Sequence, residues 1–216
     1  MTGLSPAQAK FLERFFAEPF ASTFYLTGGT ALAAYHLRHR VSLDLDLFSP
    51  SAEDVTYAAR WTVAERDARR LDITSHFAQE RFHNFRLLYG AERLRVDYCV
   101  DDAVQLPKEI HGVVRVDSVL DILANKLVAV CDFPEPKHFV DLFVGVTVGG
   151  VEMTRVLEHA RAKRRLDPYH LARALHQGKH ARLEGLRLYV DIDREAMARW
   201  YEDFRNRILA DLGPPA

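Results

Sequence analysis

The amino-acid sequence predicts an α+β fold, in which a strand-rich first half is followed by a helical second half. Up to about residue 116, several segments alternate polar and apolar residues with a period of two, which is typical of half-buried strands. After that point the apolar residues recur at helical spacing. The chain has 216 residues, 48% of them hydrophobic, and a net charge of −1, so it can bury a core and is not disordered. We therefore expect a core domain over residues 1–117 and a helical subdomain over residues 118–216.

The individual elements follow from these patterns and from helix-capping residues. Ser5 begins the first helix, with Pro6 in its first turn and Gln8 completing a capping box. Ser51 caps a helix that runs to about residue 70, and Asp193 caps the last helix. The other predicted helices cover residues 30–38, 118–131, 137–144, 152–165, 168–176 and 194–212. Predicted strands cover residues 24–27, 42–48, 73–77, 82–89, 93–100 and 113–116.

Several classes of protein are excluded. No apolar run approaches the roughly 18 residues of a membrane-spanning helix. The N-terminal residues show neither a continuous apolar stretch nor a small-residue cleavage site, so we expect no signal peptide. Cys99 and Cys131 lie too far apart for a Cys-x-x-Cys pair and are typical of a reducing compartment. We therefore expect a cytoplasmic protein.

Two carboxylates in the predicted strand 42–48 indicate a metal site. Asp44 and Asp46 lie two residues apart, so they project from the same face of a strand, about 7 Å from each other. Leu43, Leu45 and Leu47 would then point into the core. Two neighbouring carboxylates repel each other unless a cation lies between them, and their hard oxygen atoms suit Mg²⁺ or Mn²⁺ better than zinc.

The same Asp-x-Asp spacing can also arise by chance. It recurs at Asp191 and Asp193, where the capping of the last helix explains it, and we expect no catalytic role there. The first pair is distinguished by a turn upstream. Gly28 and Gly29 lie where a strand gives way to a helix, which brings backbone N–H groups close to a phosphate, and the Thr30 hydroxyl can cap the helix or donate to a phosphate oxygen.

A third carboxylate belongs to the predicted strand 93–100. Asp97 lies on the face opposite Leu94, Val96 and Tyr98. If this strand pairs beside the strand 42–48, Asp97 joins the acid pair; taken alone, it would be a surface acid. Three carboxylates can hold two divalent ions for phosphoryl transfer.

Charge is distributed unevenly along the chain. Residues 151–190 carry nine Lys and Arg against four acidic residues, a net +5, which leaves −6 for the rest. A basic segment of this kind fits a polyanionic partner, although it is equally compatible with a solvated helix surface.

Taken together, these motifs resemble a known family. The run over residues 28–48, GGTALAAYHLRHRVSLDLDLF, is similar to the AbiEii-type (MenT-like) nucleotidyltransferase toxins of bacterial toxin–antitoxin pairs, whose motif reads Gly-Gly-Thr-Ala and then His-Arg-x-Ser-x-Asp-x-Asp-x-Phe. Asp97, Lys126 and Asp141 fit further elements of that family. His138 departs from it, because the family usually has Asp there.

The resemblance implies the nucleotidyltransferase fold of the DNA-polymerase-β-like superfamily, with a mixed-sheet core and a helical C-terminal subdomain. Asp44 and Asp46 would bind Mg²⁺, and Asp97 would serve as a metal ligand or base. The substrate would be an NTP. Its expected binding residues are Gly28, Gly29, Thr30, Arg40, Lys126 and Asp141.

Two of these residues also have interpretations that need no family. On a helical wheel Lys126 lies among apolar residues, so it either reaches water or pairs with a buried anion. Asp141 lies four residues after Lys137 and would form a salt bridge on the helix surface.

Three functions are therefore open. The favoured one is an enzyme that transfers a nucleoside monophosphate from an NTP to the 3′ end of tRNA, as the growth-inhibiting toxin of a pair with an antitoxin partner. The second keeps the fold but uses a protein or a small molecule as acceptor. The third is a non-catalytic module that binds nucleotide.

Overall fold

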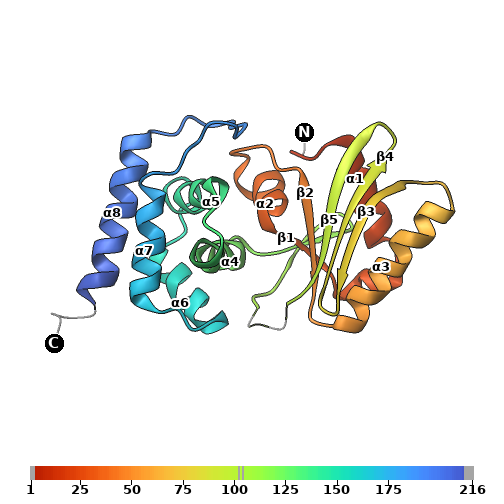
Figure 1. Cartoon of the computed structure of the whole chain (residues 1–216), viewed down its shortest axis with the longest axis horizontal. Coiled ribbons are helices and arrows are strands. Elements are labelled where there is room, and N and C mark those ends of the chain that lie inside the picture. Colours follow the sequence, from red (N-terminus) through yellow and green to blue (C-terminus); the bar gives the residue numbers. More distant parts are fainter. Residues whose placement is uncertain (1–2, 102, 104, 212–216) are drawn as a thin grey trace. The chain divides into compact units, whose positions relative to one another are not determined.

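The computed structural model describes residues 3–101, 103 and 105–211 (Figure 1). Their contacts form two compact units that do not follow each other simply along the chain. The first comprises the residues up to Arg38 together with Ser42–Ser118, and the second comprises His39–Val41 together with the residues from Val119 onward. A segment of three residues from the first half of the chain therefore folds with the second half.

A seven-stranded mixed sheet forms the centre of the first unit, in the order β3-β4-β5-β2-β1-β7-β6. The pairs β2–β5 and β1–β7 are parallel, and the other neighbours are antiparallel. The strands are β1 (Tyr25–Thr27), β2 (Asp44–Ser49), β3 (Asp72–Gln79), β4 (Phe82–Tyr89), β5 (Glu92–Val100), β6 (Glu109–His111) and β7 (Val114–Val116). The strand β6 is not among the predicted ones, because three exposed residues show no usable alternation.

The helical elements of this unit are α1 (Pro6–Phe16), the 3₁₀-helix η1 (Pro19–Thr23), α2 (Gly28–Ala31), the π-helix η2 (Leu32–Leu37) and α3 (Ala52–Asp67). The predicted capping box is confirmed, since the Ser5 hydroxyl accepts from the backbone of Gln8 and the Gln8 side chain accepts from the backbone of Ser5. The helices α1 and α3 lie against the sheet (Figure 1). Their packing includes an aromatic cluster that contains Phe15, Trp61 and Tyr98.

One face of the strands is therefore apolar and the other is polar. In β2, Leu45 and Leu47 are fully buried, while Asp44 and Asp46 alternate with them. The expectation that Leu43 enters the core is wrong, because its side chain is 61% exposed. The carbonyl groups of residues 42 and 43 accept hydrogen bonds from the side chain of Gln8, at 3.1 Å each, and the strand begins only at Asp44.

The second unit is helical. Its helices are α4 (Val119–Asp132), α5 (Pro136–Thr147), α6 (Met153–Lys163), α7 (Pro168–Gly178) and α8 (Arg194–Ala210). Asp193 caps α8 as predicted, by accepting from two backbone N–H groups. The helix ends at Ala210, and the predicted terminus at Leu212 lies outside the described residues. The Tyr201 hydroxyl donates to the carbonyl of Phe139 at 2.7 Å, which joins α8 to α5.

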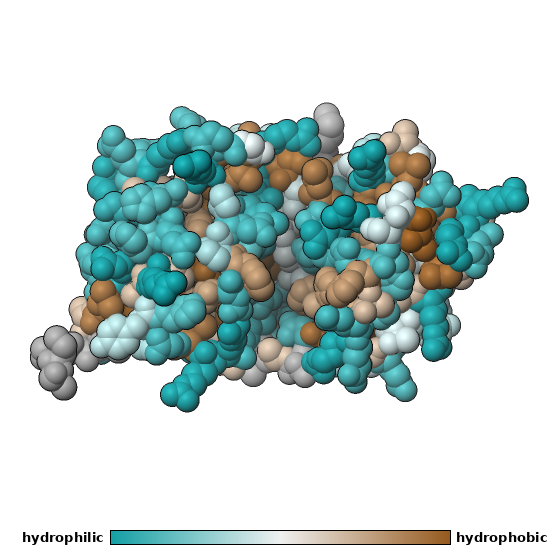
Figure 2. Space-filling model, viewed as in Figure 1, coloured by the Kyte–Doolittle hydropathy of each residue, from teal (hydrophilic) through white to brown (hydrophobic). Residues whose placement is uncertain are grey.

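The segment His39–Val41 joins this unit by backbone hydrogen bonds. The N–H of Val41 donates to the carbonyl of Arg187, and the N–H of Tyr189 donates to the carbonyl of His39, both at 2.8 Å. In the part of the chain that the structure describes, no helix has the length and apolar character needed to cross a membrane. The surface drawn in Figure 2 is mainly hydrophilic, with scattered hydrophobic patches.

Candidate active site

The predicted carboxylates lie next to each other on the polar face of the sheet. Asp46 of β2 is in register with Asp97 of the parallel strand β5. The same row of the sheet continues to Thr27 of β1 on one side and to Asn84 of β4 on the other. Asp44 lies two residues before Asp46 and on the same face. The strand alternation thus brings together three acids that are separated by up to 53 positions in the sequence, as a count from 44 to 97 shows.

A cation from the protein already lies among these acids. The guanidinium of Arg95 donates to Asp97 at 2.8 Å and lies 3.9 Å from Asp44. The amide of Asn84 also donates to Asp97. Partial burial acts to lower the pKa of Arg95, but the hydrogen bond to Asp97 and the negative charges of Asp97 and Asp44 raise it overall. The guanidinium of Arg95 therefore keeps its positive charge. Sequence reasoning missed Arg95, yet its position two residues before Asp97 on one strand face was a usable signal.

Gly28 provides the space in which Asp46 lies. Its φ of +68° is in the left-handed region, and a Cβ atom there would lie 1.9 Å from an oxygen of the Asp46 carboxylate. A glycine is therefore required for both conformation and room. Gly29 and Thr30 are buried, and the Thr30 hydroxyl donates to the backbone carbonyl of Asp44. This hydrogen bond joins the turn to the start of β2, a role that differs from both sequence-based expectations for Thr30.

The acids fit a divalent cation in their chemistry, since they offer hard carboxylate oxygens, and Asp44 is one third exposed. The close contact of Gly28 with Asp46 supports this fit, because it keeps a side chain out of the space beside the carboxylate. Among the described residues, no three acidic, histidine or cysteine side chains are already gathered closely enough to hold a metal. Arg95 and Asn84 occupy the oxygens of Asp97 instead. The three-acid metal site stays a prediction.

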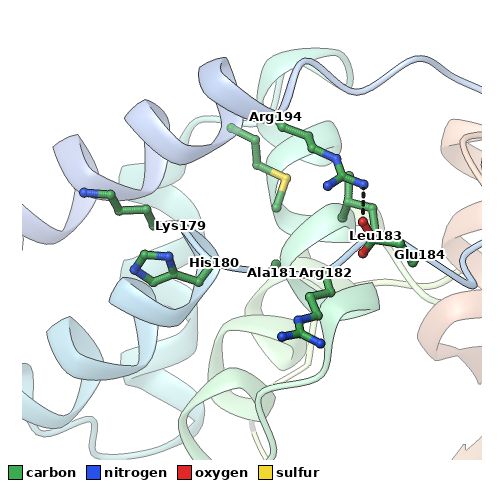
Figure 3. A pocket seen from close by; sticks show the side chains of 9 residues that line it. Lys179, His180, Ala181, Arg182, Leu183, Glu184 and Arg194 are labelled. Carbon is green, nitrogen blue, oxygen red and sulfur yellow. Dashed lines mark hydrogen bonds and ion pairs between the residues drawn. The ribbon is translucent and has the colours of Figure 1, made fainter.

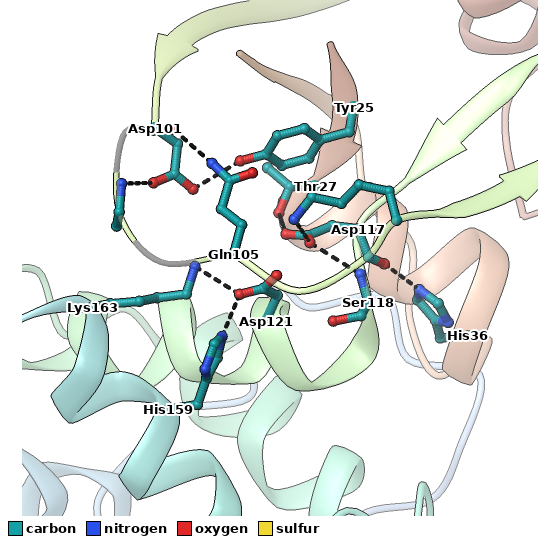
Figure 4. A network of polar contacts seen from close by, with 12 residues as sticks. Tyr25, Thr27, His36, Asp101, Gln105, Asp117, Ser118, Asp121, His159 and Lys163 are labelled. Carbon is teal, nitrogen blue, oxygen red and sulfur yellow. Dashed lines mark hydrogen bonds and ion pairs between the residues drawn. The ribbon is translucent and has the colours of Figure 1, made fainter. Parts of the chain in front are cut away.

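Further polar residues surround Thr27, which lies beside Asp46 in the row of residues across the sheet (Figure 4). The Thr27 hydroxyl donates to the buried carboxylate of Asp117 at 2.7 Å. The ammonium of Lys108 binds the same carboxylate at 2.7 Å and lies 4.1 Å from the centre of the Tyr25 ring. These contacts fix Thr27 beside Asp46 and were not accessible from local sequence patterns.

The second unit contains a separate buried network around Asp141. Its carboxylate receives two hydrogen bonds from the guanidinium of Arg40, at 2.6 and 2.8 Å, and one from His39 at 2.7 Å. Lys126 lies 3.4 Å away. Burial acts to raise the pKa of Asp141, but Lys126 and the hydrogen bonds from Arg40 and His39 lower it, so the group stays ionised.

This arrangement decides between the sequence-based interpretations of these residues. The expected surface salt bridge between Asp141 and Lys137 is wrong, because Asp141 is fully buried and Lys137 pairs with Glu135 at 2.8 Å. Lys126 is paired with a buried anion, one of the two alternatives. Arg40, predicted near phosphates, has its guanidinium bound to Asp141.

A known protein family matches almost the whole chain. The family model described as "Nucleotidyl transferase AbiEii toxin, Type IV TA system" matches residues 10–215. The chain belongs to the AbiEii family. The predicted membership is thereby confirmed, and this AbiEii chain is a nucleotidyltransferase toxin of a toxin–antitoxin system, which implies an antitoxin as partner. A comparison with curated proteins found no match.

Solved structures agree on the fold. A candidate nucleotidyltransferase from H. pylori is 16% identical with a TM-score of 0.55, and the match covers 97% of both chains. JHP933 from Helicobacter pylori is 18% identical with a TM-score of 0.53, and the match covers 97% of this chain and 94% of that one. MenT4, the nucleotidyltransferase toxin Rv2826c from Mycobacterium tuberculosis H37Rv, is 15% identical with a TM-score of 0.50, covering 93% and 84%. The predicted nucleotidyltransferase fold is confirmed.

His138, for which the resemblance predicts an Asp in other family members, is mostly buried in α5. Its Nδ1 atom lies 3.2 Å from the carbonyl of Phe133. Burial, together with the positive charge of Lys126, lowers the pKa of His138 to about 4. The imidazole is therefore neutral near pH 7, where an Asp would be negatively charged.

Part of the basic segment 151–190 in the AbiEii chain is paired with acids. Lys163 contacts the buried Asp121 at 2.7 Å, beside His159 (Figure 4), and Arg164 pairs with Asp132. A pocket of about 500 Å³ lies between the end of α7 and the start of α8 (Figure 3). Its charged residues are partly paired as well, since Arg194 binds Glu184 at 2.8 Å. Pairing reduces the positive charge that this segment can offer to a polyanion.

Proposed function

We propose that this AbiEii toxin transfers a nucleoside monophosphate from an NTP to a hydroxyl group of an acceptor, the 3′ end of tRNA being favoured. The observation that carries this proposal is the register of Asp46 and Asp97 on neighbouring parallel strands, with Asp44 on the same face and the Gly28 turn against Asp46. Acid rows of this kind suit transfer chemistry in which charge must be neutralised at the reacting phosphate.

The proposed reaction is a single displacement at phosphorus. The acceptor oxygen forms a bond to the α-phosphorus of the NTP, and the bond from that phosphorus to the oxygen that links it to the β-phosphate breaks, so that pyrophosphate leaves with this oxygen. Asp97 would take the proton of the acceptor hydroxyl; as a third metal ligand instead, it would leave that proton to pass to solvent. Asp44 and Asp46 would hold Mg²⁺ or Mn²⁺, which would supply charge neutralisation at the transferred phosphate and the leaving pyrophosphate.

The second unit contributes to nucleotide binding in this proposal through Lys126. Asp141 fixes the ammonium group of Lys126, whose side chain is 10% exposed, and Lys126 binds the triphosphate as a point charge. Asp141 and Arg40 are then positioning residues. Because Arg40 is bound to Asp141 through two hydrogen bonds, it holds the carboxylate and need not contact phosphate itself.

Transfer to tRNA is tested by incubating the protein with labelled NTPs, Mg²⁺ and total tRNA. The Asp46→Asn variant keeps the size of the side chain but removes its charge, and we expect labelling to fall about 100-fold or more. The matched control is Asp191→Asn, which alters the other Asp-x-Asp pair on an exposed segment and should label like the wild type. Equal labelling by wild type and Asp46→Asn would contradict the proposal.

The same assay separates the other acceptors. Transfer of label to protein or to a small hydroxylated molecule, with tRNA unlabelled, would replace the favoured acceptor by the second one. Binding of NTP without release of pyrophosphate would indicate the non-catalytic nucleotide-binding module. His138 is the one residue in the sequence that favours this third function.

A further inference from the structure

The polar face of the sheet continues beyond the acids as an exposed surface. Strand register places Arg86 of β4 beside Arg95 of β5, and Arg95 beside Asp44. Arg93 lies two residues before Arg95 and so projects from the same face. All three arginine side chains are exposed. We call Arg86, Arg93 and Arg95 the arginine face.

A pocket of about 490 Å³ opens within the arginine face. It is lined by all three arginines, by Asp44 and Thr74, and by leucines 43, 87, 88 and 94. The pocket thus combines positive charge with apolar walls. Because Asp44 forms part of its lining, a ligand bound there would directly adjoin the predicted catalytic acids.

The charge of this face is only partly neutralised by the protein. Arg95 is bound to Asp97, whereas Arg86 and Arg93 have no carboxylate partner among the residues that the structure describes. In the basic segment of the second unit, Lys163 and Arg164 are paired with acids, whereas Arg161 and Arg165 are exposed and provide the comparison used below. Two unpaired guanidinium groups beside the acid row offer donors that suit anionic oxygens.

An exposed aromatic side chain lies at the outer end of the acid row. Phe77 of the edge strand β3 is in register with Asn84, which itself is in register with Asp97. The side chain of Phe77 is 54% exposed. An exposed ring on a sheet that also carries exposed arginines is the arrangement on which unstacked bases of single strands pack.

We propose that the arginine face and Phe77 bind a single-stranded segment of an RNA acceptor, with Arg86 and Arg93 on its phosphates and Phe77 on a base. This inference rests on the proposed function and specifies the acceptor surface. Charge complementarity and the aromatic ring favour a nucleic acid over a protein. The sheet, rather than the basic segment 151–190, is then the main RNA contact.

Binding is measured in the Asp46→Asn background, so that turnover plays no part. The probe is a fluorescent single-stranded RNA 12-mer that ends in CCA, and its Kd is determined by anisotropy over a range of salt concentrations. In the double variant Arg86→Gln/Arg93→Gln we expect a higher Kd. The plot of log K against log salt, whose slope is negative, should become less steep by about 1.4, which is about 0.7 for each lost phosphate contact. The Phe77→Ala variant should weaken binding about tenfold and leave this slope unchanged.

The matched control is Arg161→Gln/Arg165→Gln, which removes two exposed arginines from the basic segment and should have a small effect. Thermal melting establishes that each variant is folded. An unchanged Kd and slope for Arg86→Gln/Arg93→Gln would overturn the inference, and so would a larger loss in the control pair. Calorimetry with NTP alone gives a further criterion: if the Arg86→Gln/Arg93→Gln variant loses NTP affinity instead, the arginines bind the triphosphate and the inference is wrong.

The two proposals fail in different ways. RNA binding that depends on Arg86 and Arg93, with no transfer by the active protein, would contradict the proposed function and support the arginine face. Transfer to tRNA that does not change in the arginine variants would support the proposed function and contradict RNA binding by the arginine face.

Discussion

Gly28 shows how one residue controls the geometry of the candidate site. Its positive φ and the absence of a Cβ atom let the turn approach the Asp46 carboxylate. The proposed role of the Gly-Gly turn in holding phosphate adds to this observed role. Gly90 has almost the same φ, +62°, but a Cβ atom there would have no neighbouring atom within 4 Å. The two glycines therefore form a natural comparison.

We expect Gly28→Ala to lower both stability and activity, and Gly90→Ala to lower only stability. Each substitution forces an L-residue into the left-handed region, at a cost of about 1–2 kcal/mol. Only Gly28→Ala also displaces Asp46, so its transfer activity should fall well beyond that of the control. Urea denaturation and initial rates measure the two effects. Equal activities of the two folded variants would show that Asp46 needs no such space.

At this scale the sequence predicted some residues well and others not at all. Asp46 and Asp97 were accessible because strand alternation fixes which face a residue occupies. Their position in one row of the sheet needed one further assumption, the pairing of β2 with β5. The partners of Asp97 were not accessible in the same way, because the hydrogen bond from Asn84 depends on the register of a third strand.

At the scale of elements, the buried carboxylate of Asp141 connects α5 to α4 and to the segment His39–Val41. Local patterns located these elements, but they could not show the pairing of Arg40 with Asp141, because 101 positions separate the two residues. Helix spacing suggested the nearer Lys137 instead. A buried pairing of this kind depends on tertiary packing, which periodicity does not report.

The Asp141 network makes stability depend on pH. The pKa of Asp141 is lowered in the folded protein, so its contribution is complete well above the unfolded value of about 3.9 and is lost as the pH falls from about 5. We expect Asp141→Asn to destabilise the protein by about 3–5 kcal/mol at pH 7, because Arg40 and Lys126 lose their anion. The difference from wild type should shrink at pH 3.

Urea denaturation at both pH values measures this difference. The control is Asp132→Asn, which removes the partly exposed partner of Arg164 and should cost no more than about 1 kcal/mol. A destabilisation by Asp141→Asn that is the same at pH 3 and pH 7 would mean that the ionised carboxylate is not the source of the stability.

At the scale of the whole molecule, the sequence predicted the order of a strand-rich half and a helical half, since both periodicities are strong. It contained no indication that His39–Val41 folds with the helices. Three residues between a helix and a strand carry no periodic signal. The second unit is thus completed by residues that lie about 80 positions before its first helix, counted from Val41 to Val119.

We expect a fragment of residues 119–216 to fold poorly for this reason. It lacks Arg40 and His39, which leaves Asp141 buried with Lys126 as its remaining ionic partner. Introducing Asp141→Asn into the fragment should then stabilise it, the opposite of its effect in the full chain. Circular dichroism melts of the fragment with and without this substitution measure the reversal. The expectation would be contradicted if the fragment melted cooperatively and if Asp141→Asn lowered its melting temperature.

The parallel pairing of β2 and β5 also restricts how the length of this chain can change during evolution. Successive side chains of a strand point to opposite faces of the sheet. A single insertion or deletion before Asp97 within β5 would therefore turn the Asp97 carboxylate toward the apolar face and place a neighbouring side chain beside Asp46. Extra residues at the turn around Gly90 would be absorbed without changing the face of any neighbour. Related chains should therefore differ in length at the hairpin and keep the spacing inside the strand.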